Sequence, residues 1–378
     1  MGRVFLLAVV ALATSMSVMT AALGAPLVID APGVYVLDAD ILDCSDTRGI
    51  LIAASDVTLD GNGHTLDGIG QLATYGVFVF NPSGVLTNVT VKNLAVTDWS
   101  IGIFYQETAG GTIVGNTIEA NTLMGIYLNE CAGIAVEDNA VISNATYGTH
   151  FWAASGNTVA GNTFSGHLIG VDLRASSNGN TIAHNTVTSN EYGVWLVDSG
   201  DNTIYDNWFE NVHPLGYAGT LYANEWNVAK QPGTSIAGGP YLGGNFWADP
   251  DGTGFSETGT DADSDGICDA PYALAAGNID YLPLFLGPQT QLANLTGFIV
   301  DAIASDGIAS EMQASLLAKV DAAMAALAHG NPNDVTVAMN GIKALVKQVQ
   351  AQTDKKIEPA TAAEIIRRAN QVIAALGG

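Results

Sequence analysis

The sequence predicts an all-β right-handed parallel β-helix of about 23 residues per coil, followed by a small all-α helical bundle. One seven-residue pattern returns five times, and its recurring asparagines are 22 or 23 residues apart. A glycine before a short apolar strand keeps the same period at 102, 125, 148, 170 and 193. Two markers in phase over about 100 residues indicate stacked structural repeats. The repeats read TIVGNTI (Thr112–Ile118), AVEDNAV (Ala135–Val141), TVAGNTF (Thr158–Phe164), TIAHNTV (Thr181–Val187) and TIYDNWF (Thr203–Phe209).

Each repeat contains short runs that alternate with a period of two residues, which is typical of β-strands and not of a helix. One repeat cannot bury its apolar side chains alone, so the repeats must stack, with about 4.8 Å between coils. Strand crossovers favour the right-handed form. The asparagine column is expected at a turn, because asparagine tolerates left-handed backbone and its amide can bond the next amide. Two inward columns are predicted, Val136, Val159, Ile182 and Ile204, and Val141, Phe164, Val187 and Phe209.

The order of segments predicts five parts. Residues 1–24 have a positive start at Arg3, an apolar run and a small-residue cleavage site, which together are typical of a signal peptide. The β-helix is predicted over 25–216, and a cap with an acidic loop over 217–286, where the repeat period is lost. Residues 287–291 are predicted as a linker. Residues 292–378 carry apolar stripes at helical spacing and are predicted as a four-helix module.

The net charge of −25 comes from 37 acidic and 12 basic residues, and it lies almost wholly before residue 289. Such a surface repels nucleic acid and anionic membranes and attracts cations. Beyond the signal segment, no stretch is long and apolar enough to span a bilayer. Cys44, Cys131 and Cys268 are widely separated and odd in number, so the sequence leaves their pairing open.

The opening SDVTLDGNGHTLDG (Ser55–Gly68), the coils, and the ending GGPYLGGNFW…DADSDGICDAPY…IDYLPL resemble NosD-like right-handed β-helix proteins over about residues 27–286. The helical tail is similar to the small FIMAH-type module of secreted multidomain proteins. The resemblance implies a secreted or cell-surface protein with a carbohydrate-binding or sugar-hydrolase type of β-helix. The copper-related role behind the family name is not carried over, because the sequence has no Met/His/Cys cluster.

The acidic loop of the predicted cap has the spacing of a calcium site without an EF-hand frame. Alternate carboxylates can converge on one cation, and Gly266 permits the sharp turn. The alternative is an acidic surface turn without an ion. The predicted calcium ligands are Asp261, Asp263, Asp265 and Asp269, with the carbonyl of Ile267.

A second candidate site is a ladder of outward side chains on the glycine-led strands. Exposed aromatic rings can stack on the apolar faces of sugars, and the flanking polar groups can bond hydroxyls. The alternative is that a loop or the helical module covers these rings. The predicted glycan-binding residues are Phe104, Tyr127, His150, Trp152, Asp172, Arg174 and Trp195.

Three functions are open on the sequence alone. The first is a secreted or cell-surface protein that binds a glycan or cell-envelope polysaccharide, with calcium in its cap. The second is a polysaccharide lyase or glycoside hydrolase centred on Asp172, with His150 and Arg174 as the other catalytic candidates. The third is a structural envelope component in which the helical module docks another protein.

Overall fold

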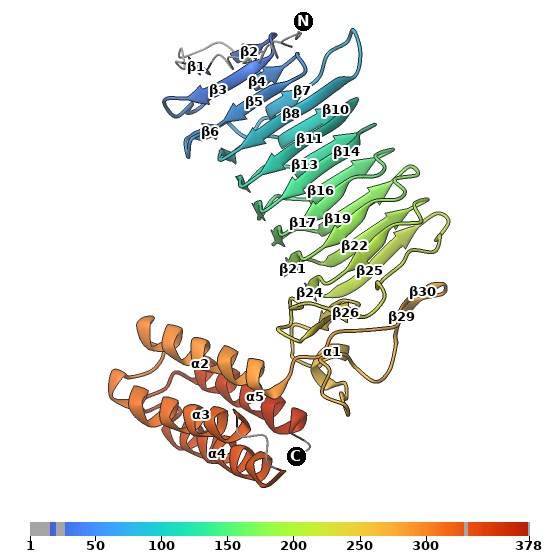
Figure 1. Cartoon of the computed structure of the whole chain (residues 1–378). Helices are drawn as coiled ribbons and strands as arrows, with labels where there is room; N and C mark the ends of the chain where they lie inside the picture. The colour runs from blue at the N-terminus through green and yellow to red at the C-terminus, as the bar shows by residue number, and fades with distance from the viewer. Residues whose placement is uncertain (1–15, 20–26, 329–331, 377–378) are drawn as a thin grey trace, which may run out of the picture. The chain divides into compact units, whose positions relative to one another are not determined.

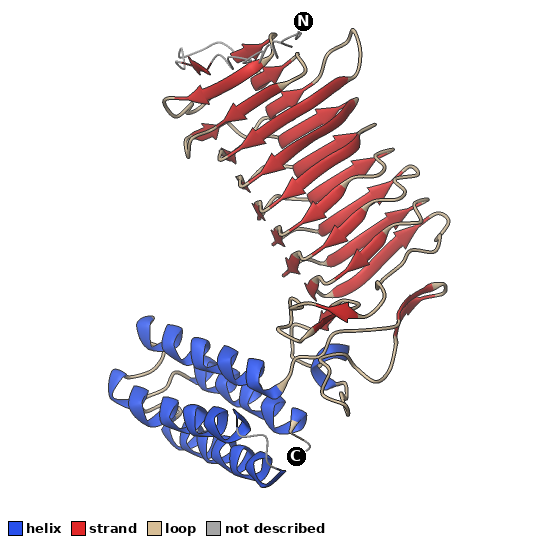
Figure 2. Ribbon diagram, in the orientation of Figure 1, coloured by secondary structure: helices blue, strands red, loops and turns tan. Residues whose placement is uncertain are grey.

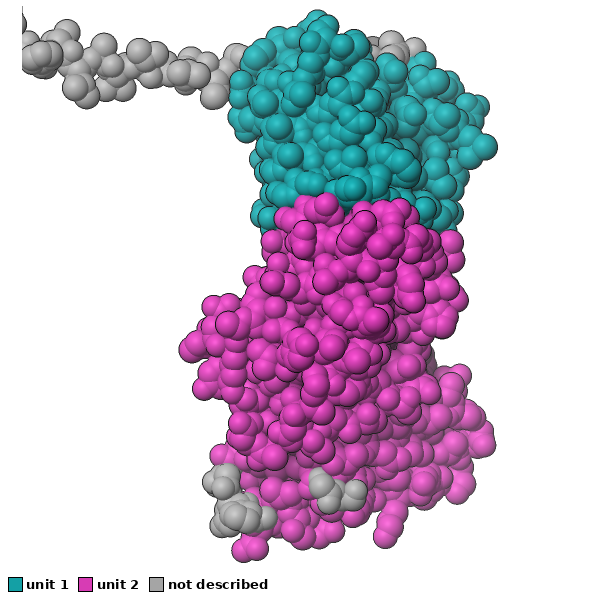
Figure 3. All heavy atoms as spheres, turned by 90° about the vertical axis from the view of Figure 1, so that its right-hand side faces the viewer, with its two compact units in different colours: residues 1–163, 172–177 teal, residues 164–171, 178–378 magenta. Residues whose placement is uncertain are grey.

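The computed structural model describes residues 16–19, 27–328 and 332–376. Most of the predicted signal peptide, 1–24, lies outside the described residues; its segment Met16–Met19 forms strand β1, which pairs in parallel with Val34–Leu37. The chain divides into two compact units, residues 1–163 with 172–177 and residues 164–171 with 178–378 (Figure 3).

Three parallel sheets of stacked strands confirm the predicted β-helix (Figures 1 and 2). The first sheet contains, in spatial order, β1 (Met16–Met19), β3 (Gly33–Leu37), β5 (Val57–Asp60), β8 (Leu86–Lys92), β11 (Thr108–Val114), β14 (Ala132–Glu137), β17 (Thr158–Ala160), β20 (Thr181–Ala183) and β23 (Thr203–Tyr205). The second contains β2 (Leu27–Ile29), β4 (Arg48–Ile52), β7 (Tyr75–Val79), β10 (Ile101–Gln106), β13 (Met124–Asn129), β16 (Tyr147–Trp152), β19 (Ile169–Arg174), β22 (Tyr192–Val197) and β25 (His213–Ala218). The third contains β6 (Thr65–Asp67), β9 (Ala95–Thr97), β12 (Thr117–Glu119), β15 (Ala140–Ile142), β18 (Thr163–Ser165), β21 (Thr186–Thr188), β24 (Trp208–Glu210) and β28 (Phe246–Ala248).

The strands pair in the register that the repeat predicts, so equivalent side chains lie above one another. Val136 lies opposite Val159, and Val187 lies opposite Phe209. All eight side chains of the two predicted inward columns are buried. The glycine near the start of a second-sheet strand has a packing role at Gly125, where a Cβ would lie 2.4 Å from Cγ1 of Val141. The interior therefore leaves no room for a side chain at that corner.

The recurring asparagines form a buried hydrogen-bonded ladder, as predicted. Nδ2 of Asn116 donates to Oδ1 of Asn139 at 2.9 Å, and Nδ2 of Asn139 donates to Oδ1 of Asn162 at 2.9 Å. The backbone N–H of Asn116 also donates to that oxygen of Asn139, at 3.0 Å. Each side-chain amide thus takes the place of a water molecule that would otherwise bond the turn. The buried polar groups of the turn are therefore hydrogen-bonded although water is excluded.

The prediction that asparagine itself takes the left-handed conformation is wrong. The residue before each asparagine does so instead, with φ of 52° at Asp138, 69° at Gly161 and 57° at His184. That residue turns the chain, and the following asparagine side chain points into the stack. A further amide ladder, which the period did not reveal, joins Asn121 to Asn144 at 2.8 Å and Asn190 to Asn211 at 2.8 Å.

The β-helix continues beyond its predicted end at residue 216. Nδ2 of Asn207 donates to Oδ1 of Asn245 at 2.9 Å, so the asparagine ladder extends by one more coil across 38 residues. Strand β28 pairs with β24, and the ring of Trp247 stacks on Phe209 at 4.8 Å. The period is lost in the sequence because this last coil carries a long excursion, not because stacking stops.

A buried carboxylate holds the last coil together. Oδ2 of Asp280 accepts bonds from the backbone N–H of Asn245 at 2.7 Å and from the indole of Trp247 at 2.9 Å. Oδ1 accepts from Leu282 N at 3.0 Å. The residues around it form two short antiparallel pairs and one helical turn: β26 (Gln231–Pro232), β27 (Tyr241–Leu242), α1 (Phe255–Thr258), β29 (Tyr272–Ala275) and β30 (Asn278–Asp280).

The helical region has the predicted four α-helices and one short 3₁₀ turn. The first helix begins at Pro288, so most of the predicted linker, 287–291, belongs to its first turn. The apolar stripes pack into one core that includes Ile299, Leu316, Ile342 and Ile365. The elements are α2 (Pro288–Ala304), η1 (Ser310–Met312), α3 (Gln313–Ala328), α4 (Pro332–Gln352) and α5 (Pro359–Ala375).

Removing one rung of the ladder should destabilise the β-helix. In Asn139→Ala, the N–H groups of Asn116 lose their acceptor in a buried turn, which should lower the free energy of unfolding by roughly 2–5 kcal/mol. Urea unfolding followed by circular dichroism measures this loss. The control is Asn340→Ala, an exposed position on α4, which should change stability by less than about 0.5 kcal/mol. Equal stability of the two variants would contradict the role of the ladder.

The last coil should become less stable as the pH rises toward neutrality. Burial raises the pKa of Asp280 to about 7, against the opposing effect of its hydrogen-bond donors. The native state therefore holds this proton after the unfolded chain has lost it, and the stabilisation present below about pH 4 is lost through pH 7. A shift of about three units corresponds to roughly 4 kcal/mol.

The measurement is the melting temperature between pH 4 and 8 for the wild type, Asp280→Asn and Asp321→Asn. Asp280→Asn is neutral throughout, so its melting temperature should fall less over this range than that of the wild type. Asp321 is exposed on α3 and serves as the control. An unchanged pH slope in Asp280→Asn would show that Asp280 does not titrate in this range.

Candidate functional site

The outer face of the second sheet stacks aromatic rings from successive coils. Phe104 lies opposite Tyr127, and Tyr127 opposite His150, in the predicted register. The ring centroids of Phe78 and Phe104 are 4.8 Å apart, those of Phe104 and Tyr127 are 4.5 Å apart, and those of Tyr127 and His150 are 4.9 Å apart. The 23-residue repeat thus produces a continuous column of rings, which we call the ring column, Phe78–Phe104–Tyr127–His150.

The ring column is less exposed than the sequence predicts. Phe104 is 6% exposed, His150 is 5% exposed, and Asp172 is completely buried. Each ring covers the next at van der Waals distance, and side chains at the strand ends cover the column from both sides. The prediction that these residues face open water is therefore wrong for Phe104, His150 and Asp172, whereas Trp152, at 45%, is well exposed.

Side chains at both ends of the strands frame the ring column. At one end, Gln106, Asn129 and Trp152 lie in register. At the other end lies Tyr147, whose ring centroid is 4.8 Å from that of His150. The sequence does not point to Tyr147. This residue precedes the glycine of its strand, whereas the predicted outward positions alternate along the residues that follow that glycine. The aromatic walls of the face therefore come from Tyr127, Tyr147 and Trp152.

The structure brings the three predicted catalytic candidates into one cluster. Nδ1 of His150 bonds Oδ2 of Asp172, and Nε of Arg174 donates to both oxygens of Asp172, at 3.0 and 2.7 Å. Nη2 of Arg174 also donates to the hydroxyl of Tyr147 at 3.3 Å, with the guanidinium 5.5 Å from that ring. We call His150, Asp172, Arg174 and Tyr147 the charged cluster.

Asp172 orients its neighbours and cannot touch a large ligand. It is completely buried, and its oxygens are bonded to His150 and Arg174. A buried carboxylate requires such partners, because an isolated charge in the interior is strongly unfavourable. The bond to Nδ1 leaves Nε2 of a neutral His150 as the nitrogen with the free lone pair. Burial raises the pKa of Tyr147, with Arg174 opposing the rise, so the phenol is protonated at neutral pH.

Trp195, the last predicted ligand residue, belongs to the second compact unit. Its ring meets that of Tyr192 edge-on, with centroids 4.7 Å apart. It also lies over Gly216, where a Cβ would come within 2.2 Å of its ring. The side chain is half-buried, and its indole nitrogen is buried without a hydrogen-bond partner among the described residues.

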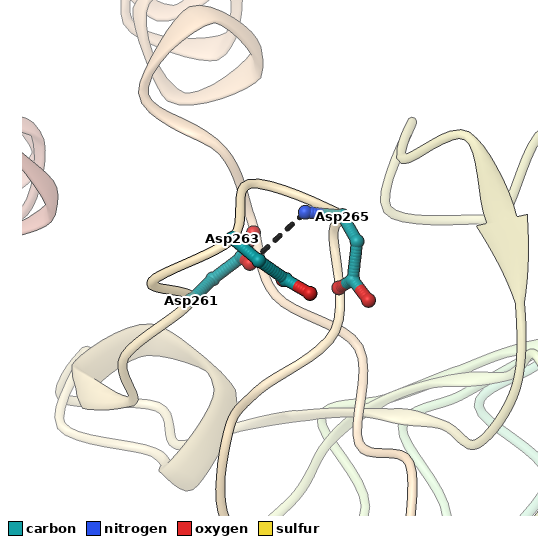
Figure 4. Close-up of side chains that lie close together, drawn as sticks. All are labelled: Asp261, Asp263 and Asp265. Carbon is teal, nitrogen blue, oxygen red and sulfur yellow. Dashed lines mark hydrogen bonds between the residues drawn. The ribbon is translucent and has the colours of Figure 1, made fainter.

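The acidic loop brings three of its predicted ligands together. Asp261, Asp263 and Asp265 each have a carboxylate oxygen within 4.8 Å of the others (Figure 4). Oδ1 of Asp261 accepts from the N–H of Asp265 at 3.0 Å, and Oδ2 accepts from Gly266 N at 2.9 Å. Burial raises the pKa of Asp261, and the Asp265 charge adds to this rise while the two N–H groups oppose it. Lys230 forms an ion pair with Asp265.

The other two predicted ligands lie differently. The carboxylate of Asp269 is outside the group of three and accepts hydrogen bonds from the N–H of Ala262, at 3.1 and 3.3 Å. Ile267 is buried, and it pairs with Leu284 in an isolated antiparallel bridge. Asp269 therefore closes the loop on itself in this conformation instead of pointing at the carboxylates.

The donor atoms in the described residues do not suit a soft or borderline metal. Their histidines are dispersed: His64 pairs with Asp40 at 3.0 Å, and His184 pairs with the buried Asp206. The group Asp261, Asp263 and Asp265 is the one set of three or more acidic, histidine or cysteine ligands in the described part of the chain. Carboxylates alone suit calcium, magnesium or manganese, whereas copper prefers imidazole and sulfur donors.

The three cysteines are free thiols, so the pairing that the sequence left open does not occur. Burial raises the pKa of Cys131 and of Cys268 to about 12, which keeps both thiols protonated and unreactive. No helix among the described residues has the length and apolar character needed to cross a membrane.

Two solved structures are similar in part. The Dettilon tailspike protein (gp208) is 13% identical with a TM-score of 0.42; the match covers 63% of this chain and 56% of that one. The Azotobacter vinelandii mannuronan C-5 epimerase AlgE4 A-module is 16% identical with a TM-score of 0.26, over 56% of this chain and 79% of that one. This chain thus spans little more than half of the tailspike chain. No curated protein matches the sequence.

The family model described as periplasmic copper-binding protein (NosD) matches residues 43–252. This range contains the coils, the ring column, the charged cluster and the Asn245–Trp247 part of the last coil. Because the match covers more than half of the chain, the protein belongs to the NosD family of β-helix proteins.

Proposed function

We propose that the protein binds polysaccharide outside the cytoplasm, on the outer face of the second sheet. The observation that carries the proposal is the aromatic wall of Tyr127, Tyr147 and exposed Trp152 beside the charged cluster. Aromatic rings offer flat apolar surfaces to the C–H faces of sugars, and the polar groups beside them can bond hydroxyls. A purely structural stack has no need of an exposed tryptophan at this position.

The spacing of the coils favours a polymer over a single sugar. The ring column repeats every 4.8 Å or so, and its four rings extend over roughly 15 Å, the length of a few sugar units. One aromatic contact contributes only about 1 kcal/mol, so useful affinity requires several contacts along a chain. Phe78 and Phe104 of the ring column are covered by their neighbours, so the contacts come from Tyr127, Tyr147 and Trp152.

Two other functions receive less support. A glycoside hydrolase centred on Asp172 needs a carboxylate that reaches the substrate, but Asp172 is buried and bonded on both oxygens. The copper named in the family description does not fit the donors of the described residues, whose acidic group has carboxylates alone. Docking of another protein by the helices α2–α5 stays a prediction.

We also propose that the acidic loop binds calcium in the cap. Asp261, Asp263 and Asp265 bring three carboxylates close together, which repel one another unless a cation is present. Lys230 supplies one positive charge at Asp265, and calcium would compete with it. The role is structural, because the loop lies beside the segment that stacks the last coil.

The glycan proposal predicts weaker binding in Trp152→Ala. Loss of one stacking contact should raise the dissociation constant of the best-bound oligosaccharide about threefold to tenfold. Binding isotherms from calorimetry, over a panel of neutral and acidic oligosaccharides, measure the change. Tyr281→Ala removes a ring of the second unit that is even more exposed than Trp152 and should leave the affinity unchanged. If Trp152→Ala binds as tightly as the wild type, this face is not the binding site.

The calcium proposal predicts a ligand-dependent rise in melting temperature. Binding to the native state alone stabilises by mass action, by about 2.7 kcal/mol at a hundred times the dissociation constant. The double variant Asp263→Ala with Asp265→Ala should lose this rise. Asp269→Asn should keep most of it, because the structure places that carboxylate outside the group. An undiminished rise in the double variant would place calcium elsewhere.

A further inference from the structure

Beyond binding, we propose that the charged cluster cleaves uronate-containing polysaccharides by β-elimination. This inference rests on the proposed polysaccharide-binding face. It starts from the juxtaposition of an imidazole, a phenol and a guanidinium on one outer face: His150 and Tyr147 have ring centroids 4.8 Å apart, and Arg174 bonds the Tyr147 hydroxyl at 3.3 Å. The three groups lie close enough together to act on one sugar unit, and His150, which is 5% exposed, is the least accessible of them.

The hydrogen bonds of the three groups suit the roles that elimination requires. The bond from Nδ1 of His150 to Asp172 leaves Nε2 as a base. Arg174 donates to the oxygen of Tyr147, so the O–H of Tyr147 can donate to another acceptor. Burial raises the pKa of Tyr147, which keeps its proton available as an acid. The guanidinium of Arg174, partly exposed, can pair with the carboxylate of a uronate.

The reaction balances without a further reactant. Pairing of the substrate carboxylate with Arg174 makes the hydrogen on C5 more acidic. That C5–H bond breaks, its proton goes to Nε2 of His150, and its electron pair forms the C4=C5 double bond. The C4–O4 bond then breaks, and O4 leaves with the phenolic proton of Tyr147. Solvent returns the proton from His150 to Tyr147, so the protein ends as it began.

Asp172 acts in this scheme as a positioning residue. It holds the imidazole by Nδ1 and the guanidinium by Nε, and does not touch the sugar. By bonding both side chains, this carboxylate fixes the imidazole relative to the guanidinium that in turn bonds the hydroxyl of Tyr147. A fixed relative orientation is the main requirement for a base and an acid that act on adjacent carbons. Tyr127 and Trp152 lie beside His150 and can seat the neighbouring sugar units.

The test uses the full-length protein with uronate-containing polysaccharides and, as matched controls, the same polymers with their carboxyl groups reduced to alcohols. Ultraviolet absorbance detects the C4=C5 double bond, and a separate assay counts new reducing ends. We expect both signals from at least one uronate polymer and neither from its reduced form. Tyr147→Phe, which keeps the ring, should lower the rate about a hundredfold or more. Tyr217→Phe, an exposed position on β25, should leave it unchanged.

The outcomes separate this inference from the proposed function. If a uronate polymer binds but no unsaturated product forms, the binding function stands and the elimination is wrong. New reducing ends without absorbance would indicate hydrolysis and also overturn it. Full activity in a folded Tyr147→Phe would remove Tyr147 as the acid. For Asp172→Asn, we expect a shifted pH profile of the rate, because the imidazole loses its anionic partner; an unshifted profile would leave Asp172 with a purely structural role.

Discussion

Hydrogen bonding between buried asparagines of successive coils is the interaction on which the structure depends. A turn in a β-helix has backbone N–H groups that no strand partner satisfies, and the interior holds them away from water. Asn139 meets this need in both directions, since it accepts from Asn116 and donates to Asn162. Each rung sets the position of the next, so the coils within each unit stay in one register. A slip by one residue would break every rung at once and turn the apolar columns outward.

The same register creates the candidate site. Once coils repeat at about 4.8 Å, any outward position becomes a column of side chains at stacking distance. Rings in such a column pack on one another, which is why Phe104 is buried although it points outward. The exposed contacts shift to the ends of the strands, where Trp152 and Tyr147 lie. In this β-helix the aromatic groups open to a ligand therefore lie at the rim of the column of rings.

The sequence predicted the features that repeat and missed those that occur once. The period was sufficient to derive the inward columns, the asparagine ladder, and the register of Tyr127 and His150. It did not reveal that Asn245 continues the ladder, because this step along the chain is 38 residues long instead of 22 or 23. The predicted exposure of the outward side chains was also wrong. Alternation along one strand does not show which side chains of the neighbouring coils cover that strand. Asp269 was expected to join the acidic group because spacing cannot tell a carboxylate that closes its own loop from one that faces a cation.

The charged cluster is hard to explain as a device for stability. Within the first unit, the column that contains Phe78, Phe104 and Tyr127 could continue with rings, and it instead changes to His150 and Asp172. Burying an ion pair in place of apolar side chains gains little or nothing, because desolvation offsets the attraction. A gain in folding stability therefore does not account for a buried carboxylate that holds an imidazole and a guanidinium beside an exposed aromatic rim.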